Sequence, residues 1–297
     1  MIRTLFTACL LLAAPTVALA QDGQPATLPD NMAERIEGAR EAQEIARVMG
    51  EVLAANAIAQ RQYAGMVPGA LAGGFRGAVS MPGDEPGLWL TTIVGQPGGA
   101  DDAPLVALAD YEIADGAIRS ETIHPSGRRQ PLEGDLLAMA RAQIVAPRAV
   151  IASPTASFCL DGEELAQDAG SSVTFLTVAL PPGESAAFDT YVLNGPFEGT
   201  SIPLGKHYRV HFDEFGQVGQ PELVTNTCEV VAWYEAEADL ASRIYVTESD
   251  TGEWPNAVQA FISAQLPLNL GVVTGDILWP MAGGTIAAPL PAAEAGL

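Results

Sequence analysis

A long helical repeat near the N-terminus constrains the fold of this chain more than any other feature. From Asn31 onward, apolar side chains recur every three or four residues, which is the spacing of one face of an α-helix. These side chains are Ile36, Ile45, Val48, Val52, Ala55 and Ala59. Asn31 can cap the helix with its side chain while Glu34 reaches back to the cap amide. The pattern therefore predicts an amphipathic helix of about eight turns from Asp30 or Asn31.

The rest of the chain is dominated by short β-rich runs separated by turn residues. Asp115-Gly116 is a strong hairpin signal, and Phe215-Gly216 predicts a second hairpin turn. Strands are expected at residues 88–94, 105–113, 117–123, 173–180, 191–193, 206–212, 218–224, 229–233, 244–247 and 268–273. Residues 65–77 are rich in glycine, so we expect a loop or a close-packed crossing there.

Two shorter helices are expected at residues 134–144 and 255–264. The first should stop before Pro147, because proline disrupts a helix interior, and the second should hold Pro255 near its first turn. Helices and hairpins are interspersed without regular strand-helix-strand alternation. This arrangement favours an α+β fold with mainly antiparallel sheets over a doubly wound parallel sheet.

A domain boundary is predicted near residues 147–157, where Pro147 and Pro154 frame a segment between the two groups of hairpins. It would divide an α+β N-terminal part, residues 31–150, from an α+β C-terminal part, residues 151–286. One continuous domain is the alternative. Residues 287–297 are rich in alanine and proline and are predicted to be a disordered tail.

The first residues have the organisation of a secretory signal peptide. Arg3 precedes an apolar stretch at residues 4–15, and Ala18 and Ala20 supply small side chains for the peptidase. Cleavage after Ala20 would remove residues 1–20 and leave a flexible leader at residues 21–30. The apolar stretch is shorter than the roughly 20 residues that span a bilayer, and the mature chain has no transmembrane segment by the same criterion. The sequence predicts a soluble periplasmic or secreted protein.

The charge balance excludes one class of partner. The chain has 14 basic and 36 acidic residues, for a formal net charge of −22. A polyanion of this density repels nucleic acid and anionic headgroups. No nucleic-acid partner and no cofactor is expected.

Two cysteines, Cys159 and Cys228, remain after signal cleavage. In an oxidising compartment, two thiols of one chain are expected to form a disulfide bond. Closing this loop would restrict the unfolded chain by roughly 4 kcal/mol in the entropy model. Metal ligation is the competing interpretation, but neither cysteine has a second Cys or a His two to four residues away. No metal site is predicted.

Large enzyme classes lack their signatures in this sequence. It contains no G-x-S-x-G elbow, no phosphate-binding G-x-x-x-x-G-K, no H-E-x-x-H and no C-x-x-C. The only lysine, Lys206, has Pro203 three residues before it, which excludes an S-x-x-K motif. No catalytic residue is assigned.

One polar segment, residues 205–213, is a candidate site. On a strand, His207, Arg209, His211 and Asp213 would share one face, and Tyr208, Val210 and Phe212 would form the core face. His207 and His211 would then lie about 13 Å apart, too far for one metal ion. An anion site built from Lys206, His207 and Arg209 remains, with a second cationic group that could face it. That second group is His124, Arg128 and Arg129. An ordinary exposed β face is the alternative.

Several motifs resemble those of uncharacterised exported proteins of Gram-negative bacteria. The similar residues are Phe158-Cys159, residues 204–210, Asn226-Thr227-Cys228, residues 258–263, Leu266-Pro267-Leu268 and Trp279. The resemblance covers about half of the chain; Gly205-Lys206 replaces an expected Gly-Gly, and the N-terminal half is unmatched. It implies periplasmic residence and pairing of the two cysteines, and it implies no activity.

Three functions are consistent with these features. The leading hypothesis is a binding or accessory protein of the cell envelope, with a small anion or an envelope protein as its partner. The second is a hydrolase that uses His207 or His124. The third is an interaction module that docks through an uncovered apolar stripe on the N-terminal helix.

Overall fold

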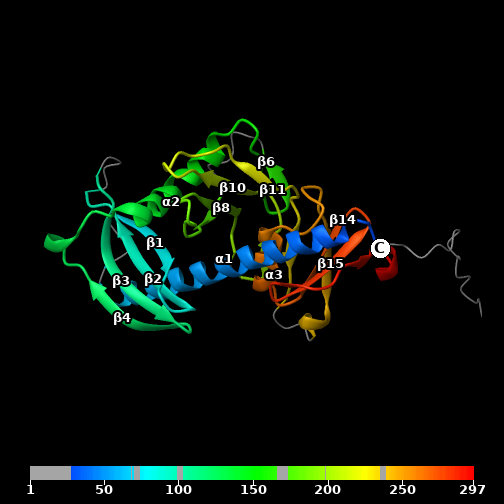
Figure 1. Cartoon of the computed structure of the whole chain (residues 1–297), viewed down its shortest axis with the longest axis horizontal. Helices are drawn as coiled ribbons and strands as arrows, with labels where there is room; N and C mark the ends of the chain where they lie inside the picture. The colour runs from blue at the N-terminus through cyan, green and yellow to red at the C-terminus, as the bar shows by residue number, and fades with distance from the viewer. Residues whose placement is uncertain are drawn as a thin grey trace, which may run out of the picture.

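Helix α1 (Met32–Met66) runs along the longest axis of the molecule and carries the predicted apolar stripe (Figure 1). The computed structural model describes residues 28–67, 69, 74–98, 103–165, 173–197, 199–234 and 239–297. The predicted signal peptide, most of the leader and part of the glycine-rich segment lie outside these residues. Val52, Ala55 and Ala59 are buried as expected, whereas Ile36 is 47% exposed. The buried face of the first turns carries Ala39 and Ala42 instead.

The predicted capping arrangement at Asn31 is wrong. Asn31 does precede the helix, but its side chain bonds no helix amide. Its Oδ1 accepts from Arg35 Nε at 3.0 Å, and its Nδ2 donates to Glu253 Oε2 at 2.9 Å. The Asn31 side chain therefore links the start of α1 to the loop that holds Glu253 instead of capping the helix.

A four-stranded antiparallel meander lies at one end of α1 (Figure 1). Its strands are β1 (Phe75–Pro82), β2 (Leu88–Gly95), β3 (Val106–Ala114) and β4 (Ala117–Ile123). The turn between β3 and β4 is the one that the sequence predicts. Asp115 and Gly116 have φ angles of 53° and 73°, which a two-residue hairpin of this kind requires.

A second antiparallel sheet has the order β11-β10-β8-β7. Its strands are β7 (Phe175–Ala179), β8 (Phe188–Asn194), β10 (His207–Phe212) and β11 (Glu222–Thr225). Two short antiparallel pairs accompany it: β5 (Phe158–Leu160) with β6 (Glu163–Leu165), and β9 (Ser201–Pro203) with β12 (Val230–Ala232). The predicted strand pair about Phe215 and Gly216 is present, although β11 is shorter than expected.

Helix α2 (Gly134–Ala152) continues through Pro147, where the sequence predicts an end. Proline inside a helix typically costs about 3 kcal/mol. Here the residues on either side, Ala146 and Val150, are fully buried in the core shared with β7, β8 and β10. Burial of this last turn and a half outweighs the local penalty, so packing overrides the proline signal.

The third main sheet lies towards the other end of α1 (Figure 1). Its strands are β13 (Ile244–Glu248), β14 (Asn269–Thr274), β15 (Ile277–Ala282), β16 (Thr285–Ile286) and β17 (Leu290–Pro291). Strands β13 and β14 are parallel, and helix α3 (Ala257–Gln265) connects them. Asn256 caps α3 through its side chain, with Gln259 completing the capping box, and Pro255 precedes the cap. The other strand pairs described are antiparallel, so the α+β prediction is confirmed.

The tail is not disordered as predicted. Ile277 pairs with Pro291 and Leu278 with Leu290, and a 3-10 turn, η4 (Ala292–Ala295), follows. Ala292 is only 9% exposed. Short 3-10 turns also occur at η1 (Ser126–Arg128) and η3 (Leu240–Ser242). The alanine- and proline-rich segment is ordered because Leu290 and Pro291 pair with strand β15.

The apolar core is not divided at residue 150. One buried cluster contains Val79 and Val94 from β1 and β2 together with Val192 and Tyr208 from β8 and β10. Helix α1 packs against α3 and the β1–β2 hairpin along its length, which leaves its central apolar stripe covered by the chain itself. In the described part of the chain, no helix is both long and apolar enough to cross a membrane.

We predict that Met49→Ala lowers the free energy of unfolding by about 3 kcal/mol, because Met49 is fully buried where α1 meets the core. Met66→Ala, on the same helix at a position that is 45% exposed, should change it by less than about 0.5 kcal/mol. Guanidinium denaturation of both variants measures the difference. Equal effects would show that α1 does not anchor the core.

Candidate functional site

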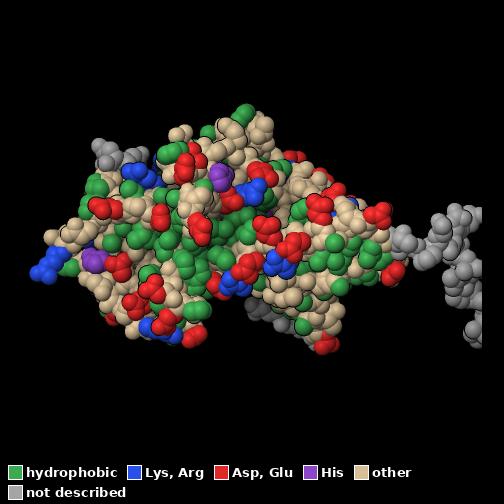
Figure 2. All heavy atoms as spheres, viewed as in Figure 1, with side chains coloured by type: hydrophobic (Ala, Val, Ile, Leu, Met, Phe, Trp, Pro, Cys, Tyr) green, Lys and Arg blue, Asp and Glu red, His purple; other side chains and the backbone are tan. Residues whose placement is uncertain are grey.

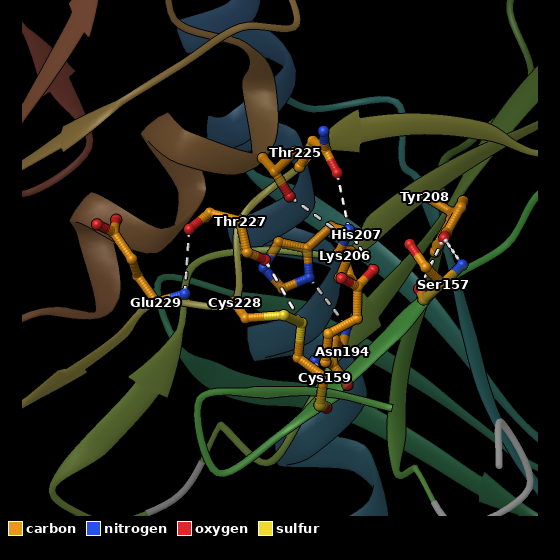
Figure 3. The surroundings of a disulfide bond; sticks show 12 residues. Ser157, Cys159, Asn194, Lys206, His207, Tyr208, Thr225, Thr227, Cys228 and Glu229 are labelled. Atoms are coloured by element: carbon orange, nitrogen blue, oxygen red, sulfur yellow. Dashed lines mark hydrogen bonds and ion pairs between the residues drawn. A yellow bond between two sulfur atoms is a disulfide. The ribbon is translucent and has the colours of Figure 1, made fainter. Parts of the chain in front are cut away.

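The disulfide between Cys159 and Cys228 is present, as predicted (Figure 3). Their Cα atoms lie 5.5 Å apart, and 69 positions separate them in the sequence. The bond joins β5 to the segment between β11 and β12. A loop of this length restricts the unfolded chain by roughly 4 kcal/mol in the entropy model.

Lys206 and its neighbours pass close to this disulfide (Figure 3). A Cβ added to Gly205 would lie 1.8 Å from the carbonyl oxygen of Thr227, so only glycine fits there. Lys206 follows with a φ of 56° and is 6% exposed. Its Nζ donates to Asn226 Oδ1 at 2.8 Å and pairs with Glu164 Oε1 at 3.2 Å. The positive charge of Lys206, the only lysine, is therefore paired with Glu164 of the same chain.

His207 cannot act as a cationic ligand, contrary to the sequence prediction. Its side chain is fully buried. Nδ1 accepts from the backbone N–H of Asn194 at 2.9 Å, which leaves Nε2 as the donor to Pro203 O at 3.2 Å. Burial lowers the pKa of His207 to about 4, and the hydrogen bond to Pro203 opposes this only in part. The imidazole is a neutral structural group that links β8, β9 and β10.

Arg209 remains partly exposed, but carboxylates neutralise it. Its Nη2 lies 2.6 Å from Glu222 Oε2, and its Nη1 lies 3.8 Å from Asp189 Oδ2. It lines a hollow of about 780 Å³ between α1 and β10–β11, whose acidic lining residues are Glu34, Glu41, Glu222 and Glu253. These four carboxylates repel an anion, so the hollow around Arg209 is a poor anion site. The predicted core face of β10 is confirmed, since Tyr208, Val210 and Phe212 are buried.

In the second predicted cationic group, His124 and Arg129 have partners within the chain, and Arg128 is exposed. His124 Nε2 lies 2.6 Å from Asp110 Oδ2, and Arg129 Nε donates to the His124 carbonyl at 3.4 Å. Arg128 is exposed on the η1 turn. Thr92 Oγ1 bonds the same Asp110 carboxylate, at 2.7 Å, and not the imidazole. A hydrolase would need the hydroxyl on the imidazole, so this arrangement lacks the contact between nucleophile and base. Among the described residues, no hydrogen bond or ion pair joins this group to β10.

Three arginines with no ion pair among the described residues gather at a different place, which we call the arginine cleft. It is a hollow of about 690 Å³ between α2, the start of β1 and the segment before β3. Its lining residues are Arg76, Gln96, Ala103, Pro104, Leu105, Leu137, Arg141, Ile144, Val145 and Arg148. No Asp or Glu is among the described residues that line it. None of its three arginines has an ion pair within the described part of the chain.

Two elements position these arginines. Arg76 stands at the start of β1, where Nε donates to Gln96 Oε1 at 2.9 Å and Nη1 to the Phe75 carbonyl at 3.3 Å. Arg141 and Arg148 are seven residues apart on α2, which places them two turns apart on one face. Gln143 fixes α2 against β1, because its Nε2 donates to the Ala78 carbonyl at 2.8 Å.

The sequence held only part of the signal for this cleft. Arg141 and Arg148 have helical spacing, but the helix was expected to end at residue 144, which left Arg148 outside it. Arg76 lies in the glycine-rich segment for which no strand was predicted. The continuation of α2 through Pro147 is what brings the second arginine of the helix to the cleft.

No protein-family model, curated protein or solved structure matches this chain. Among the described residues, no group of three or more His, Cys, Asp or Glu side chains is placed to hold a metal ion. The geometry of the arginine cleft is therefore the basis for a functional assignment.

We predict that the buried His207 makes the protein acid-sensitive. The folded pKa of about 4 lies below the ordinary 6.5, so the unfolded chain binds more protons between these pH values. The stability from the neutral imidazole is complete above about pH 6.5 and is lost as the pH falls towards 4. Near pH 5 the loss should be about 2 kcal/mol.

Urea denaturation between pH 7 and pH 5 tests this for His207→Asn, which keeps an acceptor for the Asn194 amide. This variant should show a smaller fall in stability with acid than the unsubstituted protein. His211→Asn, at an exposed position of the same strand, should keep the full fall. Parallel pH profiles for all three proteins would contradict the prediction.

Proposed function

We propose that this chain is an exported binding protein for a small organic anion and that the arginine cleft is its ligand site. One observation carries the proposal: three guanidinium groups line one hollow with no carboxylate among its described lining residues, in a chain with a formal net charge of −22. Acidic side chains are spread over the face shown in Figure 2, with far fewer basic ones among them. In such a chain, three neighbouring cations that have no counter-ion among the described residues favour a ligand that supplies the negative charge.

Arginine is suited to this role because its guanidinium stays charged at any physiological pH and binds carboxylate or phosphate oxygens in pairs. The net negative charge of the protein does not prevent binding. At physiological ionic strength, charges more than about 8 Å away are largely screened, so the groups that line the cleft dominate its potential. A bound anion would also relieve the repulsion among the three arginines.

Export is part of the proposal. Arg3, the apolar stretch and Ala20 support a signal peptide, and the disulfide between Cys159 and Cys228 supports an oxidising compartment such as the periplasm. An accessory role that docks through α1 has less support, because the stripe that it requires is covered by α3 and the β1–β2 hairpin. The hydrolase alternative has less support as well, since His207 is buried and the Thr92 hydroxyl beside His124 bonds Asp110 and not the imidazole.

We predict that the protein purified from the periplasm begins at Gln21 and contains no free thiol. Intact mass spectrometry should show loss of residues 1–20 and no reaction with a thiol reagent unless a reductant is added. Retention of Met1, or two thiols that react without reductant, would contradict export through this signal.

We predict that Arg141→Gln with Arg148→Gln weakens anion binding at least tenfold, because each charged hydrogen bond contributes about 1.5–3 kcal/mol. Inorganic phosphate, citrate and benzoate serve as probes in calorimetric titrations of the mature protein at fixed ionic strength. Arg128→Gln with Arg129→Gln removes the same charge at the end of the η1 turn, outside the cleft, and should leave the affinity unchanged within about twofold.

Equal losses in the two double variants would overturn the assignment of the site to the cleft. Asp101 and Asp102 precede Ala103 in the sequence and lie outside the described residues. If the unsubstituted protein bound no probe while Asp101→Asn with Asp102→Asn bound them, the arginines would be neutralised within the chain. That result would also overturn the proposal.

A further inference from the structure

We infer that the ligand of the arginine cleft is an amphipathic organic acid, with one anionic head and an apolar body, and not a compact inorganic anion. This inference rests on the proposed function, because it names the chemical class of the ligand at the same site. Three features of the cleft carry it: its volume, the apolar residues between its arginines, and the exposure of one of those residues.

The volume of the cleft exceeds what a simple anion fills. Pockets for organic ligands typically measure about 300–1,000 Å³, and the arginine cleft, at about 690 Å³, lies within that range. A phosphate ion occupies only a few times the roughly 30 Å³ of one water molecule in the liquid. Most of the cleft would stay filled with water if an inorganic ion were its ligand.

Apolar side chains line the part of the cleft that lies between and beside the arginines. On α2, Leu137 lies one turn before Arg141, and Ile144 and Val145 lie between Arg141 and Arg148. Leu105, which is 6% exposed, adds a fourth apolar side chain from the segment before β3. Apolar and cationic positions therefore alternate along one stripe of α2. A ligand that contacts this stripe must offer apolar surface between or beside its anionic contacts.

Val145 gives this stripe an uncovered apolar surface. It is 36% exposed although it lies in the middle of α2, next to the fully buried Ala146. Burial of apolar surface stabilises a complex by about 25 cal/mol for each Å² removed from water. An alkyl chain or aromatic ring over Val145 and Ile144 would gain this stabilisation, whereas phosphate would not. The arginines would bind the anionic head of the ligand, and the apolar residues of the stripe would contact its apolar body.

A chain-length series tests the inference. Acetate, butyrate, hexanoate and octanoate are titrated into the mature protein below their micellar concentrations, with 1-octanol as the uncharged analogue. Each CH₂ group that becomes buried should strengthen binding by up to about fourfold. Octanoate should bind at least tenfold more tightly than butyrate and at least tenfold more tightly than 1-octanol.

Val145→Asn separates the apolar contribution from the charge. This variant should reduce the gain from butyrate to octanoate at least threefold while it leaves the affinity for inorganic phosphate unchanged. Ile151→Asn, at an exposed apolar position of α2 that does not line the cleft, should change neither. A loss of octanoate binding in both variants would reflect damage to α2 and would overturn the role of Val145.

The possible outcomes distinguish this inference from the proposed function. If phosphate and all the carboxylates bind with one affinity that depends on Arg141 and Arg148, the anion site stands and the amphipathic ligand is overturned. If neither phosphate nor any carboxylate binds, both are overturned. If 1-octanol binds as tightly as octanoate, the cleft is an apolar site and the arginines do not select the ligand.

Discussion

Burial of one face of α1 is the constraint on which the rest of the structure depends. Along a single helix, Ala39 contributes to a small core cluster near β15, Met49 and Val52 to the cluster around α3, and Ala59 and Tyr63 to the cluster of the β1–β4 meander. The small side chains of the stripe let sheets and a helix approach the α1 backbone closely. One helix thereby contributes to three of the four buried clusters among the described residues. The fourth, which holds α2 with residues of β1, β2, β8 and β10, continues the core across residue 150.

Charge pairing explains why the predicted site and the arginine cleft differ. With 36 acidic residues against 14 basic ones, the cations of both predicted groups had many carboxylates to meet, and several of them do. Lys206 meets Glu164, Arg209 meets Glu222, and His124 meets Asp110. Arg76, Arg141 and Arg148 differ because apolar and amide groups surround them in the described residues. The environment of each cation, and not the local density of cations in the sequence, separates a structural cation from one that can bind a ligand.

Competition between local and tertiary forces produces the candidate site. Pro147 disfavours helix locally, while the burial of Ala146 and Val150 favours it, and the tertiary term is larger. The result extends α2 by two turns and carries Arg148 alongside Arg141. His207 shows the same principle with the opposite outcome for function. Its strand position was predicted, but the β9 segment covers that face of the sheet and removes the imidazole from solvent.

The sequence by itself determined the elements whose signals are local: the long α1, the Asp115-Gly116 hairpin, the strand alternation of β10 and the identity of the two paired cysteines. These follow from periodicity, turn conformation and the number of available thiols, which do not depend on distant residues. Only the tertiary structure decided where α2 ends, whether the last residues are ordered, and which cations keep their charge free. Each of those outcomes depends on what packs against a residue from elsewhere in the chain, and neither helical periodicity nor turn chemistry encodes that contact.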